Sequence, residues 1–391
     1  MSAAPVFLSS LGLVNALGRG KAAVARGLFR GDTGGLVLEE GWIPGAPARV
    51  GRVAGPLPAP EDLPRYARLL LAALEEIRDE VAAEIARWGP DRVGVVLGTS
   101  TSGVAEMESS IVHLGRHGAL PDGFRYEAVE MGAPARFLAQ WLGLTGPAYT
   151  VSTACTSSGK ALVSARNLLR LGVCDAVITG GVDVLCRLTL NGFSSLGAST
   201  RTLTNPMSLN RSGINIGEGS VLFVLSGEPS EVALLGVGES SDAYHISSPD
   251  PEGLGAETAM RLALADAGLT GAEPGYLNLH ATATDKNDEM ESRAVAKVFP
   301  GGIPCGGTKP LTGHMLGAAA ATELAFCWLA LHPGWNPDGL LPPHCWDGVA
   351  DPALPALDLV PAGARAADLR VCLSNAFAFG GNNLTLVAGR L

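Results

Sequence analysis

Residues 151–162 read VSTACTSSGKAL, a stretch that leads from a buried strand through a turn into a helix. The apolar run over residues 148–154 predicts the strand, and the helical period over residues 158–173 predicts the helix. Cys155 and several small hydroxylated residues lie at the turn between the two. Strands that alternate with helices are typical of an α/β fold, which this chain is therefore predicted to adopt.

The same alternation extends in both directions along the chain. Upstream, the pattern predicts a helix over residues 66–88 and a strand over residues 93–100, and a further strand follows at residues 175–181. A second series begins at residue 232, with strands at 232–238 and 276–280, helices at 256–268, 288–299 and 316–331, and strand-like segments at the C-terminal end. The two series have a similar order, which indicates two related halves, residues 1–230 and 231–391, built on largely buried sheets.

The composition is that of a compact enzyme and excludes several functions. Of the 391 residues, 47% are hydrophobic and 17% are charged, and the net charge of −10 comes without a clustered stripe of Lys and Arg. Nucleic-acid binding is therefore not expected. The seven cysteines show no CxxC spacing, so neither a metal site nor a disulfide framework is predicted, and a reducing cytoplasm fits best. Neither a signal peptide nor an apolar run of about 18 residues is recognised, so no membrane span is expected.

Cys155 is the first candidate for catalysis. At the start of a helix, unpaired N–H groups and the positive end of the helix dipole stabilise a thiolate and bring a cysteine pKa to roughly 3.5 to 7.5. The sequence therefore predicts a reactive nucleophile, with a small buried side chain as the structural alternative. The other six cysteines lack this context and are assigned to packing: Cys174, Cys186, Cys305, Cys327, Cys345 and Cys372.

Two histidines and an ion pair are the next candidates. His280 ends an apolar strand, where α/β proteins place their sites, and a Thr-rich loop follows it. His314 lies in a glycine-rich loop after Lys309. Glu323 stands in a helix that is otherwise apolar, so its carboxylate needs a cationic partner, for which Lys309 is the candidate. Core histidines with satisfied hydrogen bonds and a solvated lysine are the structural alternatives.

Residues 374–383 read SNAFAFGGNN, a strand that ends in two aromatic residues and a Gly-Gly turn. Such a turn can direct a backbone N–H into a cleft as one half of an oxyanion hole, with the N–H of Cys155 as the other half. A plain hairpin turn between core strands is the alternative.

Together these blocks resemble, over nearly the whole chain, the elongating β-ketoacyl-acyl-carrier-protein synthases of the thiolase-like superfamily. TACTSS is similar to the nucleophile motif of that family, LHATATDKND to its first-histidine motif, TKPLTGHMLGAAAATE to its lysine and second-histidine motif, and SNAFAFGGNN to its glycine-rich gate. Residues 210–220, NRSGINIGEGS, resemble a further signature whose Gly-Glu-Gly turn is structural. The resemblance implies a five-layered αβαβα sandwich of two similar halves, a homodimer, and no metal or redox cofactor. Pairing with a related subunit as a heterodimer stays open.

Carried over residue by residue, the resemblance implies a decarboxylative Claisen condensation. Cys155 accepts an acyl group from an acyl carrier protein as a thioester. His280 and His314 stabilise the enolate that forms when a malonyl group on the carrier loses carbon dioxide. Lys309, paired with Glu323, orients the two histidines.

The resemblance also assigns roles at the rim of the site. The N–H groups of Cys155 and Phe379 form the oxyanion hole, and Phe377 or Phe379 gates the acyl pocket. Arg65 and Arg68 lie where the family presents basic residues to the carrier protein, with a solvated helix face as the alternative.

Several residues depart from the common family pattern. Ala281 and Ala378 stand where glycine is frequent, Asn382 stands where threonine is, and Arg211 lacks the usual acidic residue after it. The extra methyl groups are expected to stiffen loops that normally flex. These variants are closer to the synthases of aryl-polyene pathways than to those of fatty-acid synthesis.

Three other functions are alternatives to this condensing enzyme. A Cys-His-Asn condensing enzyme would use Asn375 or Asn383, but the histidine that follows Lys309 argues against it. A thiolase would need a second active cysteine before a glycine, whereas Cys372 precedes Leu373. A catalytically silent, chain-length-factor-like subunit typically lacks the nucleophile that this chain has.

Overall fold

A twelve-stranded sheet forms the centre of the computed structural model, which describes residues 5–391. Its two half-sheets meet where β1 pairs with β10, through Val6 with Leu234 and Phe7 with Ala233. The N-terminal half-sheet contains, in spatial order, β1 (Val6–Asn15), β9 (Gly219–Ser226), β7 (Ala176–Asp183), β5 (Val93–Gly98) and β6 (Ala148–Val151), with β2 (Gly18–Arg19) beside β1. The C-terminal half-sheet contains β10 (Ala233–Ser241), β15 (Asn382–Gly389), β14 (Val371–Ala378), β11 (Tyr276–Leu279), β12 (Pro304–Gly307) and β13 (Asp358–Leu359).

The two half-sheets repeat one strand order. In each, leaving the short β2 and β13 aside, the first strand of the chain pairs with the last, the last with the fourth, the fourth with the second and the second with the third. The directions also agree, since both pairings of the last strand are antiparallel and the other two are parallel. This agreement supports the division into residues 1–230 and 231–391, which stays a prediction.

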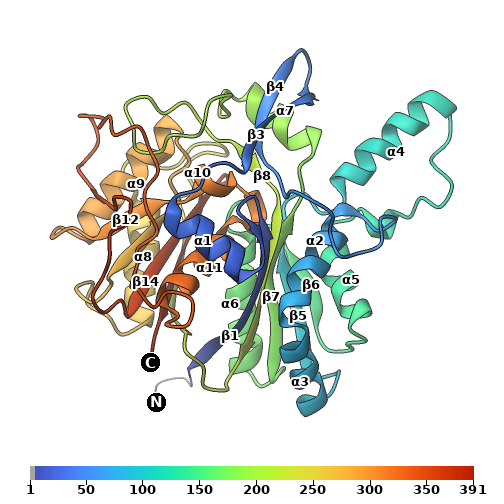
Figure 1. Ribbon diagram of the computed structural model, residues 1–391, viewed down its shortest axis with the longest axis horizontal. Helices are drawn as coiled ribbons and strands as arrows, with labels where there is room; N and C mark the ends of the chain where they lie inside the picture. The colour runs from blue at the N-terminus through green and yellow to red at the C-terminus, as the bar shows by residue number, and fades with distance from the viewer. Residues whose placement is uncertain (1–4) are drawn as a thin grey trace.

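Helices separate and cover the half-sheets in five layers (Figure 1). Between the half-sheets, α6 (Ser157–Arg170) packs against β5 and β7, α11 (Ala319–Leu331) packs against β14, and the two helices contact each other. Outside the N-terminal half-sheet lie α2 (Arg65–Leu74), α3 (Arg78–Trp88) and α5 (Ala133–Trp141), and outside the C-terminal one lie α8 (Leu254–Asp266) and α9 (Asp285–Val298). The predicted five-layered αβαβα sandwich is confirmed.

Burial of the central layers explains their composition. Every residue of α11 is buried, and so is every residue of β7 and β9. Elements covered on all sides need apolar residues throughout rather than on one face. Glu323 is the charged residue within α11, so its carboxylate has to be matched inside the protein.

Most predicted boundaries are shifted by one to three residues, and three differences change an element or its end near the site. The helix expected over residues 66–88 is two helices, because a 3-10 turn, η1 (Glu75–Ile77), separates them. The strand expected to reach residue 154 ends at Val151, so the predicted turn that holds Cys155 begins earlier than expected. The helix expected over residues 316–331 begins with a second 3-10 turn, η3 (Leu316–Ala318).

The remaining elements were not predicted from the sequence, and neither were β1, β2, β9, α5, β12 and β13. These remaining elements are α1 (Lys21–Arg30), β3 (Leu36–Ile43), β4 (Ala46–Gly51), α4 (Val104–His117), η2 (Tyr126–Ala128), α7 (Arg187–Ser195), β8 (Ile216–Gly217) and α10 (Lys309–Thr312). β3, β4 and β8 form a separate small sheet. α4 extends away from the body of the molecule (Figure 1). Within residues 5–391, none of the helices has the length and apolar character that crossing a membrane requires.

Candidate active site

Cys155 lies in a tight turn that the hydroxylated residues around it hold in place. The Ser157 hydroxyl donates to the Ala154 carbonyl at 2.5 Å and accepts the Thr153 N–H at 2.9 Å. Ala154 has a φ of 53°, in the left-handed region that residues other than glycine rarely adopt. Cys155 itself is 7% exposed. The small hydroxylated residues of TACTSS therefore shape the turn that presents the thiol.

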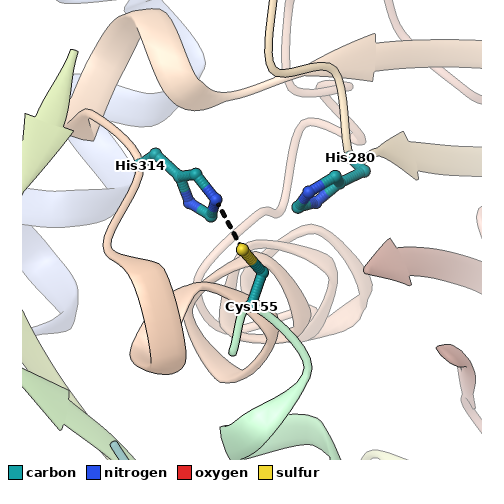
Figure 2. Close-up of side chains that lie close together, drawn as sticks. All are labelled: Cys155, His280 and His314. Carbon is teal, nitrogen blue, oxygen red and sulfur yellow. Dashed lines mark hydrogen bonds between the residues drawn. The ribbon is translucent and has the colours of Figure 1, made fainter. Parts of the chain in front are cut away.

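Three side chains converge at this turn (Figure 2). The Sγ of Cys155 lies 3.0 Å from Nε2 of His314, and the rings of His280 and His314 meet edge to face with centroids 5.3 Å apart. One ligand atom from each of the three residues lies within 4.8 Å of the other two, and all three residues are buried. They come from separate segments: the turn before α6, the end of β11, and the turn between α10 and η3. The fold thus brings together the three residues that were predicted from the sequence as candidates for catalysis.

Lys309 and Glu323 form a buried ion pair beside His280. The Lys309 ammonium contacts Oε1 of Glu323 at 2.5 Å, donates to the backbone carbonyl of His280, and lies 3.3 Å from Nδ1 of His280. An ammonium can only donate a hydrogen bond, so Nδ1 must be the unprotonated nitrogen of a neutral ring. The hydrogen of His280 is therefore on Nε2, and the ring points toward Cys155 (Figure 2).

Burial sets the protonation states of the site. Desolvation raises the pKa of the Cys155 thiol to about 12, against the opposing charge of Lys309. The low cysteine pKa predicted from the helix N-terminus is therefore wrong for the resting site, because the cost of burying a thiolate is larger. Desolvation and the charge of Lys309 lower the pKa of His280 and of His314 well below the usual range. At neutral pH the resting site holds a thiol and two neutral imidazoles.

A cysteine and two histidines could suggest a zinc site, but this donor set does not fit one. A ligating imidazole must offer a lone pair to the metal. Lys309 fixes the His280 ring with a hydrogen on the nitrogen that faces away from it. The ammonium also places a positive charge next to any bound cation, which opposes metal binding electrostatically. The residues are therefore arranged to donate hydrogen bonds rather than to coordinate an ion.

Two buried carboxylates that sequence reasoning missed hold the loop after His280. Glu291 accepts the N–H groups of His280 and Ala281 at 2.8 and 2.7 Å, and Asp288 accepts the N–H of Ala283 at 3.1 Å. Ala281 and Ala283 have φ values of 40° and 62°, a conformation that costs a residue other than glycine about 1–3 kcal/mol. The carboxylates stabilise this strained loop and so fix the backbone of His280. In the sequence, these two acids could not be told apart from the solvated acidic residues of an ordinary surface helix. No sequence signal therefore marked them as buried.

Asp183, at the end of β7, connects the two halves beneath the site. Its buried carboxylate accepts the hydroxyls of Thr99 and Thr101, both at 2.7 Å, and the backbone N–H of Ala318 at 3.2 Å. Desolvation raises the pKa of Asp183, while these hydroxyls act in the opposite direction. The contacts position the turn before α11, which follows His314 in the chain. Asp183 was also not recognised from the sequence.

The depressed histidine pKa values predict a pH-dependent stability. His314 is neutral when folded but protonated in the unfolded chain below about pH 6.5, so the unfolded state binds more protons there. The free energy of unfolding should therefore fall with decreasing pH, by about 1.4 kcal/mol per pH unit for each such histidine. Urea denaturation of His314→Asn should show a weaker pH dependence than the native chain between about pH 6.5 and 5. His245→Asn, on an exposed loop, is the control, and equal slopes for the native chain and His314→Asn would contradict the assignment.

Comparisons with known proteins agree with this geometry. A family model described as Beta-ketoacyl synthase, N-terminal domain, matches residues 58–230, and one described as Beta-ketoacyl synthase, C-terminal domain, matches residues 232–341. The chain belongs to the beta-ketoacyl synthase family. It is 33% identical to Nodulation protein E of Rhizobium sp. (strain N33), with 82% of this chain and 81% of that protein aligned. It is 32% identical to 3-oxoacyl-acyl-carrier-protein synthase 2 of Vibrio harveyi, with 81% and 80% aligned.

A solved structure of the same kind covers nearly the whole chain. The ketosynthase ApeO of Xenorhabdus doucetiae, in complex with its chain length factor ApeC, is 43% identical to this chain. The two superpose with a TM-score of 0.93 over 99% of this chain and 98% of that one. This ketoacyl synthase is therefore an acyltransferase of the 3-oxoacyl-acyl-carrier-protein synthase type, which confirms the predicted reaction class.

Cys155, His280 and His314 line a cavity of about 290 Å³. One wall is apolar and formed mainly around α7, by Phe193, Leu196, Ala198 and Ile214. Another wall is polar and formed by the loop after His280 and a facing loop, with Thr282, Thr284, Lys286, Ser247 and Ser248. Leu196 is 60% exposed although it lines the cavity, so the apolar part opens toward the surface near α7.

The two aromatic residues of the predicted gate have different environments. Phe377 is 5% exposed and lies edge-on to the His280 ring, with centroids 6.0 Å apart. Phe379 is 37% exposed and packs on Phe193, with centroids 5.6 Å apart. The Gly-Gly turn joins β14 to β15, so the hairpin alternative is also correct. Among backbone hydrogen bonds of the described residues, none uses the N–H of Phe379 as donor.

Arg65, predicted to contact the carrier protein, also has a structural contact. Its guanidinium forms an ion pair with the buried Glu218, at 2.6 Å from Oε1, and 24% of the side chain is exposed. Glu218 belongs to the Gly-Glu-Gly turn, which explains why that turn is structural. The ion pair gives Arg65 a structural contact, and its role in carrier docking stays a prediction. Arg68 is half-buried and its docking role stays a prediction.

The competing active sites are not supported by the positions of their residues. Asn375 donates to Glu291 at 3.3 Å and accepts the Thr385 hydroxyl at 2.8 Å, so its amide holds the core behind His280. The amide of Asn383 donates to Asp242 at 2.6 Å. The six other cysteines carry free thiols, and all but the partly exposed Cys345 are buried, as packing residues would be.

Proposed function

We propose that Cys155, His280 and His314 carry out the condensation catalysed by this synthase. The observation that supports the proposal most is the buried convergence of one thiol and two neutral imidazoles, with the hydrogen of His280 placed by Lys309. Two N–H donors that meet at one point stabilise an oxygen whose negative charge grows in the transition state. The enolate of a thioester is such a species.

The first half-reaction loads the enzyme. Sγ of Cys155 attacks the carbonyl carbon of an acyl group carried as a thioester by an acyl carrier protein. Because burial keeps the thiol protonated, its proton has to leave with the attack, and Nε2 of His314 at 3.0 Å is placed to receive it. The proton then passes to the departing pantetheine sulfur, so the carrier thiol is released and an acyl-cysteine remains.

The second half-reaction forms the carbon–carbon bond. The malonyl carboxylate leaves as carbon dioxide, and the electron pair of the broken bond forms the thioester enolate. The Nε2–H of His280 stabilises the enolate together with His314, which in this step carries its hydrogen on Nε2 rather than on Nδ1. The enolate carbon attacks the acyl-cysteine carbonyl, whose oxygen accepts the N–H groups of Cys155 and Phe379. The Cys155 thiolate then leaves and takes up one proton from solvent. Phe377 or Phe379 gates the acyl pocket, and Lys309 with Glu323 orients His280.

Replacing His280 should separate the two half-reactions. His280→Ala retains the Cys155 thiol and should still form the acyl-enzyme, whereas release of carbon dioxide from malonyl-carrier should fall by about 10²–10³-fold, the usual cost of one oxyanion donor. Mass spectrometry of the acyl-enzyme and carbon dioxide release measure the two steps. His245→Ala is the matched control. If His280→Ala releases carbon dioxide as fast as the native chain, groups other than His280 must stabilise the enolate.

One face of the molecule has the features of a subunit interface. β6 is the edge strand of the large sheet, with an unpaired row of backbone groups that can pair with another chain. On the same side of the molecule (Figure 1), large apolar side chains are exposed on α4, α5 and β6: Ile111 58%, Val112 44%, Leu114 41%, Trp141 53% and Tyr149 36%. We call these five residues the β6–α4 face. Exposed apolar surface of this extent is typical of a protein interface.

We propose that the β6–α4 face binds a related, chain-length-factor-like subunit. The similar ketosynthase ApeO is in complex with its chain length factor, and this chain, with its cysteine and two histidines, corresponds to the catalytic member. Ile111→Asp should weaken the complex at least tenfold by burying an unpaired charge. Light scattering after co-expression with the partner subunit should then give the mass of a single subunit, whereas the native protein should give the mass of a complex of two subunits. Leu262→Asp, on an exposed part of α8, is the control. If the Ile111→Asp complex stays intact, the β6–α4 face is not the binding site of the partner.

The pathway is proposed from the loop residues that depart from the common family pattern. We propose that this ketosynthase builds an aryl polyene rather than a saturated fatty acid. The loop residues on which this rests are Ala281, Ala378 and Asn382. The cytoplasm is the proposed location. The alternative, a silent chain-length-factor-like subunit, is not favoured because the nucleophile and both histidines converge.

A further inference from the structure

We propose that Lys286 and Ser248 form an anion subsite at the mouth of the catalytic cavity, and that its ligand is the phosphate of the phosphopantetheine arm. This inference rests on the proposed function, because the arm enters the cavity only if carrier-bound thioesters are the substrates. It adds a specific contact for the phosphate to the general expectation that a carrier protein delivers the acyl group.

The geometry places a cation and a hydroxyl together above the thiol. The Lys286 ammonium donates to Oγ of Ser248 at 2.9 Å, joining α9 to the facing loop. Both residues line the same cavity as Cys155. Lys286 is exposed whereas Cys155 is 7% exposed, so the lysine stands at the mouth and the thiol at the floor. A ligand that reaches the thiol from the polar side of the cavity passes this pair.

The charge of Lys286 is not neutralised by a carboxylate. Among residues 5–391, the ion pairs do not include Lys286, although Asp285 precedes it in the chain. Asp285 instead lies 3.4 Å from Arg211. The other carboxylate of the cavity wall, Asp242, accepts the amide of Asn383 at 2.6 Å. In a chain with a net charge of −10, the cavity mouth thus keeps one cation available for an anionic ligand.

The chemistry of the mouth matches a phosphate and the groups below it match the rest of the arm. An ammonium with two further hydrogens, next to a hydroxyl, offers the donors that phosphate oxygens accept. Below the mouth, the hydroxyls of Thr282 and Thr284 contact each other at 2.9 Å on the cavity wall. These are neutral partners suited to amide groups. The order of anion site, hydroxyls and thiol is the order of phosphate, amides and thioester along the arm.

Donors with and without the phosphate test the proposal. Acyl-pantetheine, acyl-phosphopantetheine and acyl-carrier protein are compared as substrates for Cys155 acylation by the full-length protein. Lys286→Met should raise KM about fivefold to tenfold for the two phosphorylated donors, leave kcat unchanged and leave acyl-pantetheine unaffected. Lys286→Arg should restore most of the loss. Lys297→Met, on the same helix but outside the cavity, should behave like the native chain.

Each contrary result has a distinct meaning. If Lys286→Met affects only acyl-carrier protein, the lysine contacts the protein surface of the carrier and the phosphate subsite is overturned. Equal effects on all three donors, or none, also overturn it. Calorimetric binding of phosphopantetheine against pantetheine, to the native chain and Lys286→Met, does not require turnover. A phosphate preference that disappears in the variant would therefore support the subsite even if Cys155 accepts no acyl group and the proposed function fails.

Discussion

Cys155→Ala is expected to abolish acyl transfer and condensation, with kcat reduced by about 10⁴-fold or more. The variant lacks the sulfur that forms the acyl-enzyme, and no other thiol approaches the two histidines among the described residues, so no neighbouring group can take its place. Mass spectrometry after incubation with an acyl-carrier thioester should show an adduct on the Cys155 peptide of the native chain and none in the variant. Because the side chain removed is small, the variant should lose only about 1 kcal/mol of stability.

The control for this experiment is a buried cysteine outside the site. Cys174→Ala changes a thiol of similar burial at the other end of the sheet and should keep full acylation. Saturated, unsaturated and aryl acyl donors compared in the same assay test the pathway, since the aryl-polyene proposal expects the aryl donors to load fastest. A native chain that stays unacylated with all three donors would favour the silent-subunit alternative.

The fold and the positions of the catalytic residues could be predicted because the patterns that encode them are local. Alternating apolar strands and amphipathic helices are visible within windows of about ten residues. Cys155, His280 and His314 each lie in a short motif at the end of a strand or in a glycine-rich turn, where sites of α/β proteins are found. The ion pair of Lys309 with Glu323 followed from one carboxylate in an apolar helix, and the structure contains it.

The features that could not be predicted depend on the packing of distant segments. The helix N-terminus suggested a low pKa for Cys155, but the burial that raises this pKa arises in the folded site, where His280 and His314 of the C-terminal half lie against the thiol. Glu291 lies in a helix with many charged residues and Arg65 is the first residue of its helix, positions where charged side chains are usually solvated, so their buried partners were not apparent. The left-handed conformation of Ala281 has no local signal either, since alanine rarely adopts it.

Lys309→Met is the second substitution with a large expected effect, because it changes both stability and chemistry. Burial raises the pKa of Glu323 to about 7, and Lys309 acts in the opposite direction. Without the ammonium, the buried carboxyl has no cationic partner, and breaking such a pair costs about 3–5 kcal/mol. Nδ1 of His280 also loses its donor, so the ring is no longer fixed with its hydrogen on Nε2. Carbon dioxide release should therefore fall by about 10²–10³-fold.

The two effects can be separated with a second substitution. Lys309→Met combined with Glu323→Leu replaces the pair by apolar side chains, which often restores stability at a buried site. The double variant should recover most of the free energy of unfolding, measured by urea denaturation, but not the rate of decarboxylation. Lys160→Met, which breaks the more exposed pair with Glu239, should cost less than about 1 kcal/mol. If the double variant regained the native rate, Lys309 would act only by supporting the fold, and the orientation of His280 would have to come from the backbone held by Glu291.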